Sequence, residues 1–162
     1  HSTSRRQRQM CIRDRDRSVG LERENGYIAA LKENDLEVDM ENLKLGDFSY
    51  ESGYELTKKL IKKKNIPTAI FAVTDNLAIA TIDCLKDNGL NVPEDVAVVS
   101  IGDTRISQVV SPKLTTIHYH YKTSGRKSAE IMIELLKSGI RTSKTIKKDI
   151  KLSYRLIERN SV

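Results

Sequence analysis

Apolar residues recur at helical spacing in four stretches of the chain, each bounded by residues that begin or end helices. Two stretches follow Ser18 and Ser49, whose side chains can accept hydrogen bonds from the free N–H groups of a first turn. The third runs from Asp75 to Gly89, and glycine commonly follows the end of a helix. The fourth, residues 123–139, has such a broad apolar surface that it requires covering partners on more than one side.

Short apolar runs lie between these helices and are predicted to be strands. Residues 68–73 (TAIFAV) and 96–101 (VAVVSI) are continuous apolar runs, typical of strands covered on both faces in a parallel sheet. Residues 42–48 (NLKLGDF) predict a shorter strand, and the lysines of residues 145–160 favour a strand near the sheet edge. The alternation of helix and strand predicts an α/β fold with a three-layer parallel sheet.

Ligands bind at the carboxyl ends of the strands in such a sheet. Gly102 and Asp103 directly follow one predicted strand, so we expect them at the rim of a binding site. Thr74 and Asp75 follow the other buried strand and reach the same rim. Of these two, Asp75 is expected to cap the helix that it begins.

Residues 114–121 (LTTIHYHY) alternate in character, which is typical of a strand with two different faces. His118 and His120 would share one face, and Tyr119 and Tyr121 the other. Two histidines at this spacing could bind a metal ion, but no third ligand accompanies them. We therefore predict no metal site.

The positive charge of the chain is concentrated near its N-terminus. The formal net charge is +6, and residues 1–17 contribute +4 of it, with six arginines against two aspartates. The other 145 residues hold 22 basic and 20 acidic side chains and are nearly neutral. Binding to nucleic acid requires cations clustered on the folded surface, which this distribution does not favour.

Residues 1–15 have no apolar periodicity and resemble the translation of a sequencing adapter. We expect an unstructured or artefactual tail, and a basic arm that binds nucleic acid is the alternative. No apolar stretch approaches the roughly 20 residues of a membrane span or forms the core of a secretory signal. Cys11 and Cys84 have no disulfide or metal-binding spacing, which fits a reducing, cytoplasmic location.

Five segments, taken together, resemble the effector-binding core of the LacI/GalR family of bacterial transcription repressors. They are ERENGY, GDFSYESGY, FAVTDNLAIA, NVPEDVAVV and SPKLTTI. The resemblance implies a type I periplasmic-binding-protein-like fold, in which two α/β lobes surround a sugar cleft. Residues 16–162 are similar to the C-terminal part of this domain, and residues 118–139 to the segment that crosses toward an N-terminal lobe missing here.

The resemblance implies a sugar-responsive, DNA-binding repressor of the cytoplasm, of which this chain is the effector-binding and dimerisation portion. Its partners would be a sugar or sugar phosphate, a second copy of the chain, and operator DNA reached only through a missing helix-turn-helix domain. It implies no cofactor and no enzymatic activity. The alternative is a small α/β enzyme or a solute-binding protein acting on a saccharide, although no P-loop, GxGxxG or nucleophile-elbow motif supports an enzyme.

The resemblance also implies which residues bind the effector. Arg23 matches an arginine that reaches sugar hydroxyls, and Phe48 matches an aromatic residue that stacks on the sugar ring. Thr74 takes the place of a polar contact. Tyr119 and Tyr121 match positions that line the pocket.

Asp103 departs from the family pattern. Many members carry two acidic or amide residues in succession, of which the first touches the sugar, whereas this chain has Gly102 at that place. Either Asp103 substitutes for the missing contact, or the effector differs and is a phosphorylated or larger saccharide.

Apolar residues at the positions where the repressor lobes pair are candidates for a dimer interface. They are Ile79, Ile106, Val109 and Val110. The segment ISQVV would be an oddly apolar loop on a monomer, and packing within the lobe is the alternative.

Overall fold

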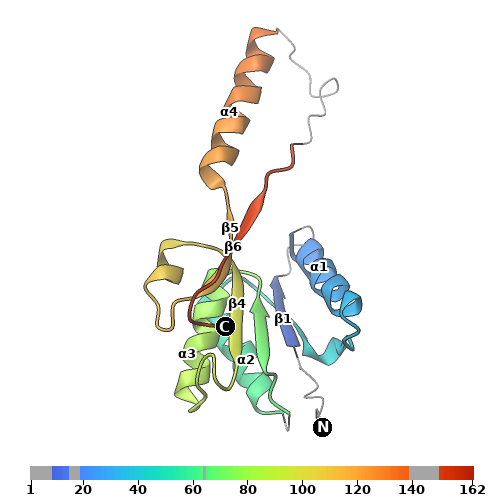
Figure 1. Ribbon diagram of the computed structural model, residues 1–162, viewed down its shortest axis with the longest axis vertical. Coiled ribbons are helices and arrows are strands. Elements are labelled where there is room, and N and C mark those ends of the chain that lie inside the picture. The colour runs from blue at the N-terminus through green and yellow to red at the C-terminus, as the bar shows by residue number, and fades with distance from the viewer. Residues whose placement is uncertain (1–8, 15–18, 64, 139–149) are drawn as a thin grey trace.

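The computed structural model describes residues 9–14, 19–63, 65–138 and 150–162, which form one six-stranded sheet in the order β2-β1-β3-β4-β5-β6 (Figure 1). The strands are β1 (Gln9–Asp14), β2 (Leu43–Gly46), β3 (Ala69–Ala72), β4 (Ala97–Gly102), β5 (Thr115–Tyr119) and β6 (Tyr154–Ile157). β1 to β5 are parallel to their neighbours, whereas β6 runs antiparallel to β5 at the edge of the sheet. The predicted α/β class is confirmed, with one antiparallel strand added.

β1 corrects the expectation that residues 1–15 lie outside the fold. Its backbone pairs on both sides, so that Cys11 lies opposite Leu43 of β2 and opposite Phe71 of β3. A strand is held by hydrogen bonds to segments that are distant in the sequence, so a short peptide without a clear apolar pattern can still complete a sheet. Residues 1–8 and 15 lie outside the described residues.

Helices cover both faces of the sheet, as the three-layer prediction requires. Ile70 and Ala72 of β3 point into a buried core that also contains side chains of α2 (Tyr50–Ile61) and α3 (Asp75–Asp87). Phe71 alternates with them and points to the other face, where its ring stacks on Tyr27 of α1 (Val19–Glu33), with 6.3 Å between ring centroids. Two short 3₁₀ helices lie in the connecting segments: η1 (Met40–Asn42) directly before β2, and η2 (Arg105–Gln108) after β4.

The ends of the helices follow simple local chemistry. Ser49 caps α2 as predicted, because its hydroxyl accepts a hydrogen bond from the backbone N–H of Ser52 at 3.1 Å. Gly89 follows α3 with φ of +76°, a left-handed conformation that glycine adopts without strain. The predicted cap at Ser18 lies outside the described residues.

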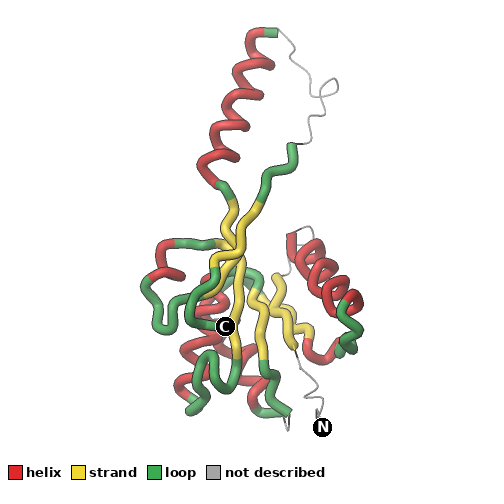
Figure 2. The backbone as a smooth tube through the Cα atoms, in the orientation of Figure 1, coloured by secondary structure: helices red, strands yellow, loops and turns green. Residues whose placement is uncertain are grey.

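α4 (Tyr121–Lys137) projects away from the rest of the molecule (Figures 1 and 2). It begins two residues earlier than predicted and has no buried residue, and its apolar side chains Met132, Ile133 and Leu136 are exposed. β5 and β6 lead from the sheet to this helix. We call their last three residue pairs the neck: Ile117 with Leu156, His118 with Arg155, and Tyr119 with Tyr154.

The C-terminal residues return to the body of the sheet. Ser161 is fully buried, and its hydroxyl donates to the carbonyl of Val98 at 2.6 Å and accepts from the N–H of Thr115 at 2.8 Å. The carbonyl of Ser161 accepts a further hydrogen bond from the N–H of Val98. Ser161 therefore joins the beginnings of β4 and β5. In the described ranges, no helix has the length and apolar character needed to cross a membrane.

Candidate functional site

One buried carboxylate, that of Asp75, lies just after β3 and contacts both β4 and β5. This side chain is 2% exposed. Its Oδ1 atom accepts hydrogen bonds from the hydroxyls of Ser100, at 2.5 Å, and Thr116, at 2.7 Å. Its Oδ2 atom accepts from both the backbone N–H and the hydroxyl of Thr104, each at 2.7 Å. Asp75 thus fastens β4, β5 and the loop after β4 to the start of α3.

This arrangement corrects the expectation that Asp75 caps α3. Thr74 is the cap of α3, because its hydroxyl accepts from the N–H of Leu77 at 3.4 Å, and Asp75 is the first helical residue. The carboxylate of Asp75 turns instead toward hydroxyls on the neighbouring strands. A buried charge needs several donors, and the strands supply them, whereas a capping role needs only the first turn of the helix.

Gly102 is required by the position of Asp75. A Cβ atom at Gly102 would lie 2.9 Å from one carboxylate oxygen of Asp75, and the backbone there has φ of +152°. Both facts exclude an ordinary side chain. The buried carboxylate of Asp75 therefore explains why position 102 is a glycine.

Asp103, the next residue, is held by two basic side chains. Its Oδ1 atom lies 2.5 Å from Nη2 of Arg159, and its Oδ2 atom lies 2.9 Å from Nδ1 of His118. Burial alone would raise the pKa of this carboxyl, but hydrogen bonding and charge from Arg159, and then from His118, outweigh burial and lower the pKa. The ionised carboxylate of Asp103 therefore connects the loop after β4 to the neck.

Arg23 reaches the same edge from α1. Its Nη1 atom donates to the carbonyl of Val73, at the end of β3, over 2.7 Å. Tyr121 is influenced by the same charges: desolvation and then the charge of Asp75 raise the pKa of its hydroxyl, while Arg23 lowers it. Arg23, Asp75 and Tyr121 therefore share one electrostatic environment, although they lie far apart in the sequence.

The aromatic candidates lie around this edge. Phe48 follows β2 and is partly exposed, and its carbonyl accepts from the side-chain amide of Asn76 in the first turn of α3 at 2.8 Å. Tyr119 ends β5, and its ring lies edge-on to that of Tyr121, with 6.1 Å between centroids. The structure thus gathers all six predicted effector-binding residues near the carboxyl ends of the strands. They are Arg23, Phe48, Thr74, Asp103, Tyr119 and Tyr121.

The predicted alternation of residues 118–121 ends earlier than expected. β5 stops at Tyr119, and Tyr121 is the first residue of α4. The ring of His118 lies edge-on to both His120, at 5.2 Å between centroids, and Tyr121, at 6.4 Å. The change from strand to helix turns these side chains, because a helix does not preserve the twofold alternation of a strand. Among the residues with described positions, no group of three potential ligands could hold a metal ion.

The dimer candidates fall into two groups. Ile79 is 7% exposed within the core, and Val110 packs against that core. Ile106 and Val109 lie in and just after η2, where they are 49% and 72% exposed. Only the second pair offers apolar surface to a partner.

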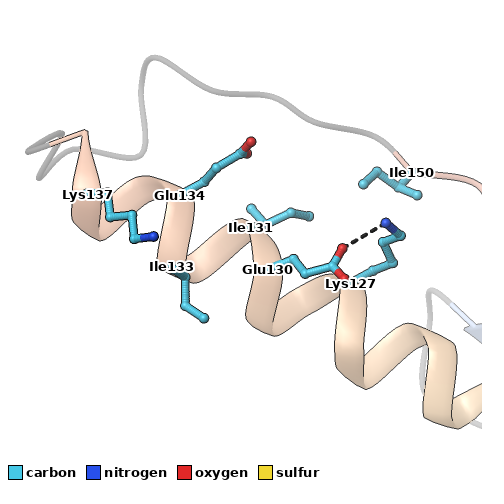
Figure 3. Close-up of a pocket in the computed structure, with 7 residues that line it drawn as sticks. All are labelled: Lys127, Glu130, Ile131, Ile133, Glu134, Lys137 and Ile150. Carbon is cyan, nitrogen blue, oxygen red and sulfur yellow. Dashed lines mark hydrogen bonds and ion pairs between the residues drawn. The ribbon is translucent and has the colours of Figure 1, made fainter.

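A hollow along α4 lies apart from this edge of the sheet (Figure 3). It is lined by Lys127, Glu130, Ile131, Ile133, Glu134, Lys137 and Ile150. Lys127 and Glu130 form an ion pair across one turn at 2.7 Å. Because every lining residue but Ile150 belongs to one helix, the hollow is the uncovered side of α4, and we do not assign the site to it.

Sequence reasoning missed Arg159 and the hydroxyls that surround Asp75. Arg159 donates to Asp103, to the carbonyl of Leu114 at 2.7 Å and to the hydroxyl of Ser107 at 3.3 Å. Its position in a charged C-terminal segment suggests a solvated residue. Ser100 and Thr116 had a usable signal, because each is a hydroxyl inside an apolar strand and a buried hydroxyl requires a partner.

The chain matches the family model of the periplasmic binding protein-like domain over residues 4–162. The HTH-type transcriptional repressor PurR of Actinobacillus pleuropneumoniae is 36% identical over 121 residues, which are 75% of this chain and 36% of that protein. The HTH-type transcriptional regulator MalR of Clostridium butyricum is 37% identical over 146 residues, which are 90% of this chain and 42% of that protein. The chain thus spans about two-fifths of the length of these relatives.

Solved structures of similar proteins have the same fold. The complex of transcriptional regulator CelR with cellobiose superimposes with a TM-score of 0.87 and 28% identity, over 97% of this chain and 47% of that one. The lac repressor dimer bound to operator and the anti-inducer ONPF gives a TM-score of 0.84 and 25% identity, over 96% of this chain and 52% of that one.

Proposed function

The chain belongs to the periplasmic binding protein-like domain family, in the form found in LacI/GalR transcription regulators, and we propose that it is the C-terminal lobe of a sugar-responsive repressor. The proposed lobe includes β1 and the described residues that follow it, since β1 lies between β2 and β3, and residues 118–139 cross toward an N-terminal lobe. The exposed apolar face of α4 supports this division, because a partner that covers it would complete a second hydrophobic core.

The observation that carries the proposal is the set of side chains at the carboxyl edge of the sheet. Arg23 offers a planar, multiply donating group, Thr74 offers a hydroxyl, and Phe48 and Tyr119 offer partly exposed aromatic rings. Sugars are bound by this combination, because their hydroxyls form hydrogen bonds and their ring faces are apolar. The effector in the proposal is a sugar or a sugar phosphate, and no cofactor takes part.

Repression requires DNA binding and pairing of subunits, and we include both in the proposal. Operator DNA would be bound by a helix-turn-helix domain on the same polypeptide, in the cytoplasm. Ile106 and Val109 would contribute to a homodimer interface, since they are exposed apolar residues beside η2. The effector would act by favouring one arrangement of the two lobes, which changes the affinity of the DNA-binding domains.

Isothermal titration tests the proposed effector site. The full-length protein that carries this lobe is titrated with cellobiose, maltose, galactose and glucose 6-phosphate, and then with closely related sugars. We expect at least one saccharide to bind with micromolar affinity, and Arg23→Met to weaken its binding about tenfold or more, because a charged hydrogen bond contributes on the order of 1.5–3 kcal/mol. Lys59→Met is the control for loss of a cation, since Lys59 is exposed on α2. The 162-residue chain alone should bind none of these sugars at micromolar concentration.

One observation keeps an enzyme as the second candidate. Asp103 and His118 form the kind of pair that orients a general base in hydrolases. Arg159 holds the other carboxylate oxygen, and no hydroxyl or thiol among the described side chains is paired with His118. Turnover of aryl glycosides or phosphosugars that is lost in Asp103→Asn would favour the enzyme over the regulator.

A further inference from the structure

The loop after β4 is held at two successive residues by different partners. Thr104 is fixed by the carboxylate of Asp75 through its N–H and its hydroxyl. Asp103 donates its own N–H to the hydroxyl of Thr116 at 3.3 Å, and that hydroxyl in turn donates to Asp75. The loop is therefore tied to the start of α3, beside Thr74 and the carbonyl that Arg23 contacts.

Asp103 adopts an unusual backbone conformation in this loop. Its φ is +52°, in the left-handed region, which residues other than glycine adopt only at some cost. Aspartate tolerates this region better than most residues, and here its side chain is fixed by an ion pair with Arg159 and a hydrogen bond with His118. In this conformation the carboxylate reaches His118 in the neck.

The two partners of Asp103 lie in β5 and just after β6. His118 lies in the neck, where it pairs with Arg155 of β6. Arg159 lies two residues after β6 and also donates to the carbonyl of Leu114, directly before β5. One carboxylate, 11% exposed, thus joins the loop to β5 and to the segment that follows β6.

Both oxygens of this carboxylate are already bound by the chain. Each oxygen could accept a further hydrogen bond, but the Asp103 side chain is only 11% exposed, so little of it is open to a sugar. The arrangement favours a mechanical role over a binding role.

We propose that Asp103 is a positioning residue that sets the geometry of the neck and transmits effector occupancy from the carboxyl edge of the sheet to α4, without contacting the effector. This inference rests on the proposed function for the meaning of the transmitted signal. Its structural claim is that β5, β6 and the loop after β4 move as one unit while the contacts of Asp103 with His118 and Arg159 are intact.

Amide hydrogen exchange of the full-length protein, without any sugar, tests this structural claim. Peptides that cover residues 115–119 and 152–157 report on the neck, and peptides that cover α3 report on the global fold. In Arg159→Met we expect the neck peptides to exchange about tenfold faster while α3 is unchanged. Arg159→Lys keeps the charge and should recover part of the protection, and Arg105→Met is the control for charge loss on η2.

Unchanged neck exchange in Arg159→Met would overturn the inference. If that variant also loses protection in α3, Asp103→Asn decides instead, because asparagine tolerates the left-handed backbone and removes only the charge. Faster neck exchange with intact α3 in Asp103→Asn supports the inference, and unaltered neck exchange contradicts it.

A second readout separates positioning from contact. With whichever sugar binds in the titration above, we expect Asp103→Asn to change the dissociation constant less than about threefold and to reduce the sugar-induced change in neck exchange. A tenfold loss of affinity with normal neck exchange would make Asp103 an effector contact and would overturn the inference. Failure of every sugar to bind would count against the proposed function, while the sugar-free exchange result would still decide the role of Asp103.

Discussion

The carboxylate of Asp75 lies 2.9 Å from the point at which a side chain on Gly102 would begin. Gly102→Ala should therefore lower the free energy of unfolding by about 1–3 kcal/mol, measured by urea denaturation, because the new methyl group has no room and the backbone is unfavourable. Gly26→Ala is the matched control. Nothing lies within 4 Å of a Cβ at Gly26, inside α1, so this change should stabilise the protein by about 0.5–1 kcal/mol. A Gly102→Ala variant as stable as the parent would contradict the close approach.

Removing the Asp75 carboxylate should be more damaging. Asp75→Ala leaves buried hydroxyls and the N–H of Thr104 without their acceptor, and we expect a loss of about 3–5 kcal/mol in unfolding free energy. Asp75→Asn should lose less, because its remaining oxygen still accepts and the hydroxyls can reorient. Glu94→Gln removes an exposed charge and should change stability by less than about 0.5 kcal/mol. Equal effects of Asp75→Ala and Glu94→Gln would contradict the role of the buried carboxylate.

The ion pairs of Asp103 predict a dependence of stability on pH. Its folded-state pKa is lowered from the ordinary 3.8, so its contribution is complete above that value and is lost as the pH falls through the lower, folded-state pKa. Arg159→Met should therefore reduce the drop in unfolding free energy between about pH 5 and pH 2. The measurement is urea denaturation followed by circular dichroism at constant ionic strength. Arg105→Met should retain the full drop, and a parental acid profile in Arg159→Met would refute the prediction.

Two tyrosines on α2 should ionise at a higher pH than ordinary tyrosines. The hydroxyl of Tyr50 donates to Asp83 at 2.8 Å, and this hydrogen bond, followed by desolvation, raises its pKa from 10.0 to about 12. Tyr54 has the same relation to Asp87, and its pKa is also raised to about 12. In a tyrosinate absorbance titration, Asp83→Ala should shift the ionisation of Tyr50 back toward pH 10. Asp87→Ala should do the same for Tyr54. The stabilising contribution of each neutral hydroxyl is complete below pH 10 and is lost as the pH rises toward 12.

The exposed pair beside η2 predicts how the protein associates. Ile106→Asp and Val109→Asp place a charge in the proposed interface, and each should raise the dimer dissociation constant at least about tenfold in sedimentation equilibrium. Ile66→Asp is the control. Ile66 is also exposed, but it precedes β3 and so lies at the end of the sheet where the parallel strands begin. Equal effects of all three substitutions would place the interface elsewhere.

The alternation of apolar runs and helices was enough to predict the middle of the fold. Residues 68–73 and 96–101 form β3 and β4, because continuous apolar runs between helical segments have few other stable arrangements. The same reasoning placed Thr74, Gly102 and Asp103 at one edge, since parallel strands end together. These predictions depend only on local pattern and on the rule for parallel sheets.

The parts that sequence reasoning missed depend on partners far away in the chain. Arg159 meets Asp103 across 56 positions, and Asp75 meets Thr116 across 41. No local pattern specifies such pairs, because the burial that makes them necessary appears only after the strands have paired. β1 was missed for the same reason: its place between β2 and β3 is set by backbone hydrogen bonds and not by its side-chain pattern.

Ser161 also bears on how the protein is made. Its hydroxyl bridges Val98 and Thr115, so these hydrogen bonds between the beginnings of β4 and β5 form only after Ser161 has been synthesised. A nascent chain that ends before Ser161 leaves the carbonyl of Val98 and the N–H of Thr115 without this partner. A chain truncated directly before Ser161 should therefore be cleaved near residues 98–115 more readily than the longer chain.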